Sequence, residues 1–271
     1  MNKTIFITGS STGLGRATAV LFASKGWNVI ATMRTPEKEE ELSKKENVLV
    51  TKLDVLDIES IQQAVRDGIQ KFGTIDILLN NAGYGAYGAL ETFSKEKIQR
   101  QFNTNVIGLL DVTKAILPHF RQNKKGLIIN ISPAGGRMAF PLGTLYHGTK
   151  YAVEGISEAL LYEVEQFGGK VKIIEPGIIA TDFGGRSFDF SNDENIHEYQ
   201  PMVNALMKTM PKMSQNALSA DAVAQFIFDA ATDGKNQLRY VVGQDAKTLL
   251  AQRQKMEDET FYLNIKTQFG I

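Results

Sequence analysis

The sequence predicts an α/β protein: a doubly wound parallel sheet with helices on both faces. Two observations predict this class. Short runs rich in β-branched and apolar residues alternate with longer segments whose apolar residues recur at helical spacing. The strand segments are apolar throughout, which is typical of parallel strands buried on both faces. Because crossovers between parallel strands are right-handed, the doubly wound order is the simplest topology.

The N-terminal part predicts a regular alternation of strand and helix. Strands are expected where β-rich runs are short, at Thr4–Thr8, Asn28–Met33 and Val48–Leu53. Helical patterns follow each of them, at Leu14–Lys25, at the charged segment Pro36–Lys45 and at Ile58–Phe72. The last helix is the clearest, because its apolar residues at 58, 61, 65, 69 and 72 share one face.

The remaining elements continue this pattern. Ile75–Leu79 is a continuously apolar strand, and a long helical region follows it to about Gln122. Further strands are expected at Leu127–Ile131, Val171–Glu175 and Arg239–Val242. Further helices are expected at about Leu145–Phe167, at Asp221–Thr232 and in a polar tail at Thr248–Phe269, within a C-terminal extension of about residues 245–271.

The segment Asp182–Gln215 interrupts the alternation. It contains a Gly-Gly pair, two Pro and several Phe and Met residues. So apolar an insertion between a strand and the next helix predicts a lid over a lipophilic site. A packing appendage and an oligomer contact are the alternatives.

Composition excludes several classes of protein. With 271 residues, 43% of them hydrophobic, the chain can bury one large core, and residues 1–271 are expected to form a single domain. Thirty basic residues balance thirty acidic ones, so no nucleic-acid or membrane-surface partner is indicated. The absence of Cys excludes disulfides and thiolate sites, and the three His are not spaced as metal ligands, so no metal is expected. No apolar run approaches the roughly eighteen residues of a membrane helix, and a cytoplasmic protein is expected.

A glycine-rich turn joins the first strand to the first helix. Residues 8–15 are Thr-Gly-Ser-Ser-Thr-Gly-Leu-Gly, with the spacing G-x-x-x-G-x-G. A helix N-terminus offers free N–H groups to phosphate, and glycines let a pyrophosphate approach the backbone. The lack of G-K-[ST] excludes a nucleoside-triphosphate loop. Taken alone, the pattern also suits any tight turn between a strand and a helix.

Tyr146 and Lys150 form the second motif, near the start of a predicted helix. Residues four apart lie on one helical face, so the phenol and the ammonium are neighbours. A nearby cation favours phenolate, and such a pair can exchange a proton with an alcohol or carbonyl oxygen. The alternative is a pair of exposed helix residues.

Two more motifs end predicted strands. Asn80-Asn81-Ala82-Gly83 follows the fourth strand, and Pro176-Gly177-Ile178-Ile179-Ala180-Thr181 follows the sixth. In a doubly wound sheet both lie at the carboxyl edge, where ligands bind. Each motif could equally be a turn or a strand terminator.

Together, these motifs resemble the short-chain dehydrogenase/reductase superfamily, in the branch with a T-G-x-x-x-G-x-G cofactor loop and a Y-x-x-x-K pair. The resemblance extends from Lys3 to about Gly243 and implies a Rossmann fold, a nicotinamide cofactor and a homo-oligomer, either a dimer or a tetramer. It implies that Tyr146 is the catalytic acid/base and that Lys150 holds the nicotinamide ribose and lowers the tyrosine pKa. It also implies that Asn105 supports a water relay to the lysine.

The resemblance also assigns the cofactor contacts. It implies that Asp54 contacts the adenine, although a cap for the helix starting near Asp57 is the alternative from spacing alone. Asn81, Ala82 and Gly83 are expected near the adenosine ribose, and Ile178 and Thr181 near the carboxamide. The full set expected to bind the cofactor is Gly9, Ser11, Thr12, Gly13, Leu14, Gly15, Arg34, Asp54, Asn81, Ala82, Gly83, Tyr146, Lys150, Pro176, Gly177, Ile178 and Thr181.

One position departs from the family pattern. The family serine lies thirteen residues before the tyrosine, where this chain has Pro133. Either Ser132 replaces it as a catalytic residue or the chemistry is weakened. His147, beside the tyrosine, is expected to be helix surface or a substrate contact.

The end of the second strand predicts the choice of cofactor. Met33 stands where NAD-specific relatives carry an acid, and Arg34 follows it. Without a carboxylate nothing repels a 2′-phosphate, and a guanidinium can pair with it, with Ser10 or Ser11 adding a hydrogen bond. The prediction is an oxidoreductase that transfers hydride between NADP(H), favoured over NAD(H), and a lipophilic alcohol or carbonyl compound. The alternative is a catalytically impaired NADP-binding regulator, favoured by Pro133.

Overall fold

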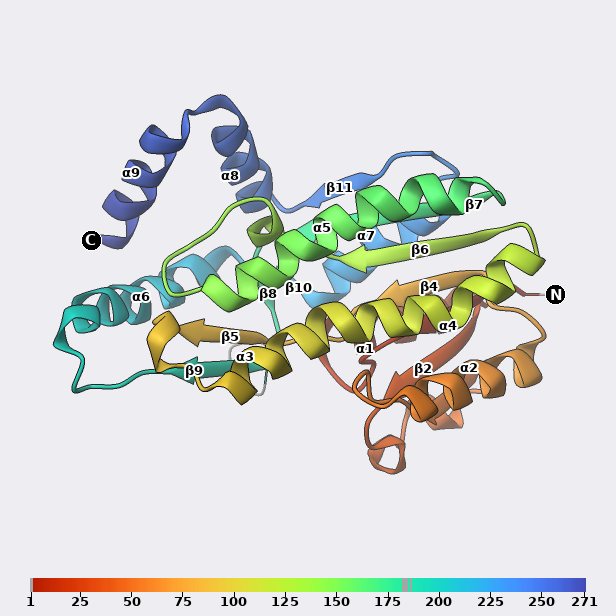
Figure 1. The fold of residues 1–271 in the computed structure, drawn as a ribbon. Coiled ribbons are helices and arrows are strands. Elements are labelled where there is room, and N and C mark those ends of the chain that lie inside the picture. Colours follow the sequence, from red (N-terminus) through yellow and green to blue (C-terminus); the bar gives the residue numbers. More distant parts are fainter. Residues whose placement is uncertain (1, 182–184, 186) are drawn as a thin grey trace.

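Seven parallel strands form the central sheet of the computed structural model, which describes residues 2–181, 185 and 187–271 (Figure 1). Their spatial order is β11 (Arg239–Val242), β7 (Gly169–Pro176), β6 (Gly126–Ile131), β4 (Ile77–Asn80), β1 (Thr4–Ile7), β2 (Asn28–Met33) and β3 (Val48–Lys52). The chain winds outward from β1 to β3 and then returns to place β4 on the other side of β1. The predicted doubly wound topology is confirmed.

Helices cover both faces because successive strand residues point to opposite sides. Ile5 and Ile7 of β1 lie in one apolar cluster with α1 (Gly13–Ser24) and α7 (Ala220–Thr232). Phe6 lies in another, with α2 (Ile58–Phe72), α4 (Gly108–Gln122) and α5 (Thr144–Glu165), which face the viewer in Figure 1. The side chain of Asp57 caps α2 by accepting from Glu59 N and Ser60 N.

One predicted helix is wrong, whereas the predicted helical tail is confirmed as a pair of helices. Pro36–Lys45 forms only two 3₁₀ turns, η1 (Pro36–Lys38) and η2 (Leu42–Lys44). The Glu39 carboxylate accepts from the N–H groups of Glu41 and Leu42, and Leu42 is buried, so local capping and tertiary packing override the helical pattern. The tail is two helices, α8 (Gln244–Lys255) and α9 (Asp258–Phe269), separated at Met256, whose backbone is extended.

The segment between β4 and α4 contains a strand that the sequence pattern did not indicate. After β4 come β5 (Gly85–Gly88), a 3₁₀ turn, α3 (Lys95–Phe102) and a π-helical turn (Asn103–Ile107) that continues into α4. β5 pairs in parallel with β9 (Phe188–Ser191), which belongs to the expected lid. The expected lid residues 182–184 and 186 lie outside the described residues.

The rest of the expected lid packs against the C-terminal extension. Short strands β8 (Ile179–Ala180) and β10 (Leu218–Ser219) pair, and α6 (Gln200–Met213) lies between β9 and β10 in sequence. Val203 and Leu206 of α6 share a third apolar cluster with Phe261 and Ile265 of α9. The elements α6, α8 and α9 therefore gather at one end of the molecule, on the left in Figure 1.

Candidate active site

The glycine turn between β1 and α1 is shaped for close approach to its backbone. Gly9 and Gly13 have φ of +72° and +56°, and a Cβ on Gly15 would lie 2.2 Å from the carbonyl oxygen of Gly9. Thr12, the N-cap of α1, makes no side-chain cap hydrogen bond. The first N–H groups of α1 therefore receive no acceptor from Thr12, which fits a site for the pyrophosphate of a dinucleotide.

Asn81 holds this turn in place. Its side-chain Nδ2 donates to the carbonyl oxygens of Thr8 (2.9 Å) and Gly9 (3.1 Å). The Thr8 hydroxyl in turn accepts from the backbone N–H groups of Asn81 and Ala82. The two motifs that follow β1 and β4 are thus joined at one edge of the sheet.

The end of β2 presents a charged side chain beside a buried one. Met33 is buried, whereas Arg34 is exposed and has no hydrogen bond or ion pair with any described residue. Ser10 is buried and its hydroxyl donates to Ile7 O at 3.2 Å, while Ser11 is exposed. Of the two serines, Ser11 is therefore the one accessible to a ligand.

Asp54 is half-buried just after β3 and is not a helix cap. Its Oδ1 accepts from Leu56 N at 3.0 Å, and Asp57 caps α2 instead. The capping alternative for Asp54 is therefore wrong.

Tyr146 and Lys150 lie in the first turns of α5 and are both buried. Lys150 Nζ donates to Ile131 O at 3.0 Å and lies 5.9 Å from the centroid of the Tyr146 ring. Burial raises the pKa of Tyr146 far above its usual value. Burial lowers the pKa of Lys150 to about 8, and the negative charge of Glu154 opposes this shift. The alternative of two exposed helix residues is wrong.

Asn105 links three elements from within the π-helical turn, a distortion frequent at functional sites. Its Oδ1 accepts from Tyr84 N (3.1 Å), and its Nδ2 donates to Tyr84 O (2.8 Å) and Thr149 Oγ1 (3.1 Å). These partners are distant in sequence, so Asn105 is not satisfied locally. Gly83 lies next to it, where an added Cβ would be 3.1 Å from Asn105 Oδ1.

Ser132 does not occupy the place of the missing serine. Its side chain is fully buried, and its hydroxyl donates to Lys150 O at 3.4 Å and lies beside the Glu154 carboxyl. The hydroxyl is therefore engaged with α5, and a catalytic role of Ser132 stays a prediction. Pro133 is half-buried and supplies only its carbonyl, which accepts from Gly136 N.

His147 is neither helix surface nor a substrate contact. It is buried, its Nδ1 lies 2.8 Å from Gly135 O, and its Nε2 accepts from Phe140 N at 3.1 Å. Accepting at Nε2 requires the proton to be on Nδ1, so the ring is neutral. Burial lowers the pKa of His147 accordingly, against the opposing effect of the Gly135 hydrogen bond. The residue ties the loop after β6 to α5.

The loop after β7 contacts both the glycine turn and the C-terminal extension. An added Cβ on Gly13 would lie 3.4 Å from the methyl carbon of Thr181. Ile178 N donates to the Asp245 carboxylate, at the start of α8, at 2.9 Å. Asp245 was not among the predicted site residues, and its only signal in the sequence is an acidic residue just after the last strand.

Aromatic rings extend the site from Tyr146 toward the lid segment. Tyr87 of β5 lies 5.4 Å from Tyr146 and 5.3 Å from Phe188 of β9, measured between ring centroids. Phe188 stacks on Phe190 at 6.0 Å. Tyr87 was not predicted as a site residue either, because the segment that forms its strand was predicted to be helical.

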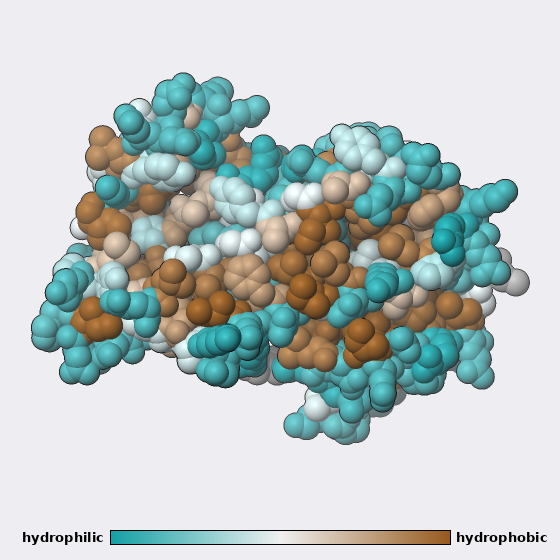
Figure 2. Space-filling model, viewed as in Figure 1, coloured by the Kyte–Doolittle hydropathy of each residue, from teal (hydrophilic) through white to brown (hydrophobic). Residues whose placement is uncertain are grey.

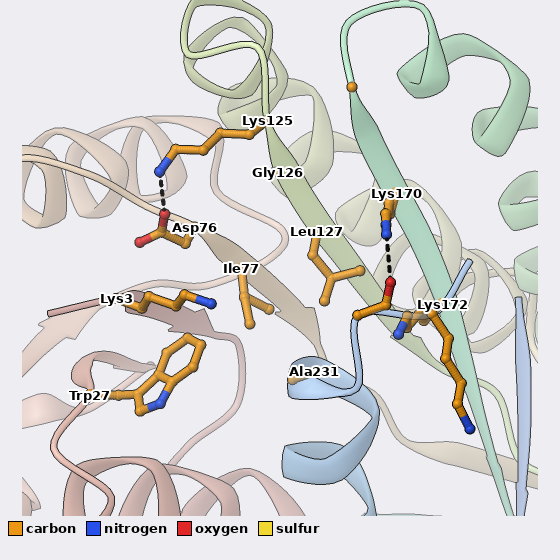
Figure 3. A pocket seen from close by; sticks show the side chains of 13 residues that line it. Lys3, Trp27, Asp76, Ile77, Lys125, Gly126, Leu127, Lys170, Lys172 and Ala231 are labelled. Carbon is orange, nitrogen blue, oxygen red and sulfur yellow. Dashed lines mark hydrogen bonds and ion pairs between the residues drawn. The ribbon is translucent and has the colours of Figure 1, made fainter. Parts of the chain in front are cut away.

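A separate cavity of about 260 Å³ lies at the opposite edge of the sheet (Figure 3). It opens at the amino ends of the strands, where Lys125 pairs with Asp76 at 2.8 Å and Lys170 donates to Gly234 O. None of the predicted site residues lines it. Since ligands of doubly wound sheets bind at the carboxyl ends, this cavity is not the candidate active site.

Among the described residues, no cluster of three or more His, Asp and Glu side chains is arranged to hold a metal ion. The part of the chain that the structure describes also contains no helix long and apolar enough to cross a membrane.

The short chain dehydrogenase family model matches residues 3–192. An uncharacterised oxidoreductase of Schizosaccharomyces pombe is 46% identical over 239 residues, which are 88% of this chain and all of that protein. A 3-ketodihydrosphingosine reductase of Bacteroides thetaiotaomicron is 42% identical over 179 residues, covering 66% of this chain and 65% of the relative. A short-chain dehydrogenase structure from Streptomyces avermitilis superposes with a TM-score of 0.84 at 31% identity, covering 98% and 95% of the two chains.

Proposed function

The chain belongs to the short chain dehydrogenase family, a family of oxidoreductases, and on that premise we propose that it transfers hydride between NADP(H) and a lipophilic alcohol or carbonyl compound. The observation that carries the proposal is the buried Tyr146–Lys150 pair on one face of α5. Lys150 contacts the end of β6, at the same carboxyl edge of the sheet as the glycine turn after β1.

Each residue of the site has a distinct task in this proposal. The glycine turn and the N-terminus of α1 hold the pyrophosphate, and Lys150 holds the nicotinamide ribose. NADP(H), when bound, supplies or accepts the hydride. The Tyr146 hydroxyl donates a proton to the substrate oxygen during reduction and accepts one during oxidation. The ammonium of Lys150 stabilises the phenolate, which offsets the effect of burial on the pKa of Tyr146.

The preference for NADP(H) is proposed from Arg34. With buried Met33 at the strand end, no carboxylate from that residue repels a 2′-phosphate, and the exposed guanidinium is available to pair with it. Arg34→Ala is expected to weaken NADPH binding at least tenfold and to leave NADH binding nearly unchanged, as measured by calorimetry. Equal affinity of the wild-type protein for both cofactors would contradict the assignment.

A lipophilic substrate is proposed from the walls of the site. The rings of Tyr87, Phe188 and Phe190 lead away from Tyr146, and the apolar cluster of α6 and α9 lies beyond them. The similarity to a 3-ketodihydrosphingosine reductase supports a ketone with a long apolar chain.

The decisive experiment follows NADPH oxidation with a panel of aldehydes, ketones and quinones of increasing chain length. The wild-type protein is expected to prefer the longer apolar members. Tyr146→Phe is expected to abolish turnover and retain NADPH affinity, while Tyr151→Phe, on the exposed side of the same helix, serves as the matched control. A Tyr146→Phe variant that keeps most of its rate would refute the proposed mechanism.

Pro133 supports a second candidate, a regulator that binds NADP(H) without turnover. A protein that binds NADPH tightly but oxidises it with no member of the panel would favour this role. The buried Tyr146 supports the enzyme instead, because a protein that only binds NADP(H) has a use for the Lys150 ammonium at the ribose but none for a phenol beside it.

We also propose a homo-oligomer that uses the exposed apolar residues of α4 and α5. Figure 2 shows apolar side chains over these helices. Leu110 and Tyr162 are exposed there, as is Ile107 just before α4, and a groove of about 450 Å³ separates the two helices near their C-terminal ends. Light scattering of the wild-type protein and of a Leu110→Glu variant would test the assembly, with a smaller particle expected for the variant.

A further inference from the structure

Two buried carboxyl groups lie behind Lys150. Glu154 is one helical turn after Lys150 on α5, and Glu175, with 0% of its surface exposed, is near the end of β7. Glu154 Oε2 accepts from Arg239 at 3.0 Å. Glu175 Oε1 lies 3.4 Å from Arg137 and 3.5 Å from Arg239. One oxygen of each carboxyl therefore faces a guanidinium.

The second oxygen of each carboxyl has no such partner. Glu154 Oε1 and Glu175 Oε2 are buried and lack a hydrogen-bond partner among the described residues; the Ser132 hydroxyl lies beside the Glu154 carboxyl but donates to Lys150 O. A buried carboxylate oxygen without a donor is strongly disfavoured. A proton on one of the two carboxyls removes one negative charge and provides a donor for one of these oxygens.

Burial of the pair and the repulsion between its two members lead to the same conclusion. The cluster contains three carboxyls, since exposed Glu158 also binds Arg239, and two guanidinium groups, those of Arg137 and Arg239. With every group ionised, these five side chains carry one excess negative charge, which the ammonium of Lys150 balances. Burial raises the pKa of both Glu154 and Glu175, and for Glu175 the repulsion by Glu154 adds to the effect.

Lys150 connects this cluster to the site. The hydrogen bond of its ammonium to Ile131 O brings no charge, and Glu154 is the acidic group that acts on it electrostatically. A buried ammonium requires a nearby negative charge to remain protonated.

We propose that Glu154 is a positioning residue for Lys150: Glu154 and Glu175 share one proton, and the single negative charge left on the pair keeps the ammonium of Lys150 charged. The pair holds this proton and does not pass it to the substrate. The inference rests on the role of Lys150 in the proposed function.

We expect replacement of Glu154 and replacement of Glu175 to have different effects on the pH profile of kcat for carbonyl reduction by NADPH. Glu154→Gln removes the negative charge next to Lys150, so Lys150 should lose its proton at a lower pH. The pH above which the rate falls should therefore be about one unit lower than in the wild-type protein, and at pH values between these two limits the variant should be up to about tenfold slower. Glu175→Gln leaves the charge on Glu154, so this limit should stay or rise. Glu158→Gln changes an exposed partner of the same Arg239, whose charge is screened by solvent, and should shift this limit less than Glu154→Gln does.

Infrared spectroscopy tests the shared proton without any turnover. At neutral pH the wild-type protein should show the carbonyl stretch of a protonated carboxyl, and this band should be absent from both Glu154→Gln and Glu175→Gln. If Glu154→Gln fails to fold, comparing the wild-type spectrum with that of Glu175→Gln still tests whether the two carboxyls share a proton. Absence of the wild-type band, or equal downward shifts of the pH limit in both variants, would overturn the proposal. A Tyr146→Phe variant that remains active would instead overturn the proposed function.

Discussion

The carboxylate of Asp245 accepts a hydrogen bond from the backbone N–H of Ile178 at 2.9 Å, in space that only a glycine at position 177 leaves open. A Cβ on Gly177 would lie 2.0 Å from that carboxylate. The bond joins the first turn of the C-terminal extension to the loop expected to contact the nicotinamide, so a segment outside the common family pattern contacts the candidate site.

Replacing Asp245 should therefore impair catalysis. Asp245→Ala loses a charge-assisted hydrogen bond of about 1.5–3 kcal/mol, so kcat/KM should fall about tenfold or more. Asp245→Asn keeps an acceptor and should retain most of the activity. Gln244→Ala, at the neighbouring exposed position, is the control for steady-state kinetics. Equal losses in Asp245→Asn and Asp245→Ala would show that the bond is not what matters.

Pro133→Ser should increase the rate. The serine hydroxyl would give the substrate oxygen a second donor beside Tyr146, and one such donor is commonly worth about 10²–10³ in rate. The buried Ser132 hydroxyl is already bonded to Lys150 O, so Ser132→Ala should change kcat little. Stopped-flow reduction of a reactive carbonyl compares the two variants. A large loss in Ser132→Ala without a gain in Pro133→Ser would reverse this assignment.

His147 should make the protein sensitive to mild acid. Because burial lowers its pKa in the folded protein, the unfolded chain binds a proton first as the pH falls below about 6.5, and stability is lost there. When the pH is lowered from about 7.5 to about 5.5, the melting temperature of His147→Gln should fall less than that of the wild-type protein. His119, whose pKa is also lowered by burial, remains in both proteins, so the difference isolates His147. Identical pH dependence would contradict the assignment.

Lys150 should cost stability at neutral pH. Burial lowers its pKa to about 8 from an ordinary value of 10.5, so between these values the unfolded chain holds more protons and wild-type stability rises with pH. Lys150→Met should remove this slope and abolish reduction. It should also raise the free energy of unfolding at pH 7 by about 1–3 kcal/mol, because the net downward shift of the Lys150 pKa already includes the opposing charge of Glu154. Denaturant unfolding of this variant and of Lys266→Met, an exposed control, provides the measurement. A destabilised Lys150→Met protein would be the contrary outcome.

Parts of the fold that depend on local pattern could be predicted from the sequence. All seven strands of the central sheet were expected at nearly their observed positions, and α2 was expected with its observed bounds. Prediction failed where a pattern was ambiguous. The charged run Pro36–Lys45 has helical composition, but the Glu39 carboxylate accepts hydrogen bonds from the backbone N–H groups of Glu41 and Leu42, and the run forms short turns instead. The strand carrying Tyr87 was hidden in a stretch that looked helical, since its partner strand is β9, far along the chain.

The sequence by itself determined the family, the glycine turn and the Tyr146–Lys150 pair, because each rests on spacing along one element and such spacing dictates which side chains share a face. Only the tertiary structure decided that Ser132 is buried, that His147 holds a loop and that Glu154 and Glu175 meet behind Lys150. Burial and partners depend on which elements pack together, and the bond between Asp245 and Ile178 spans 67 residues. No local period encodes such contacts, so they arise only when the sheet and its helices assemble.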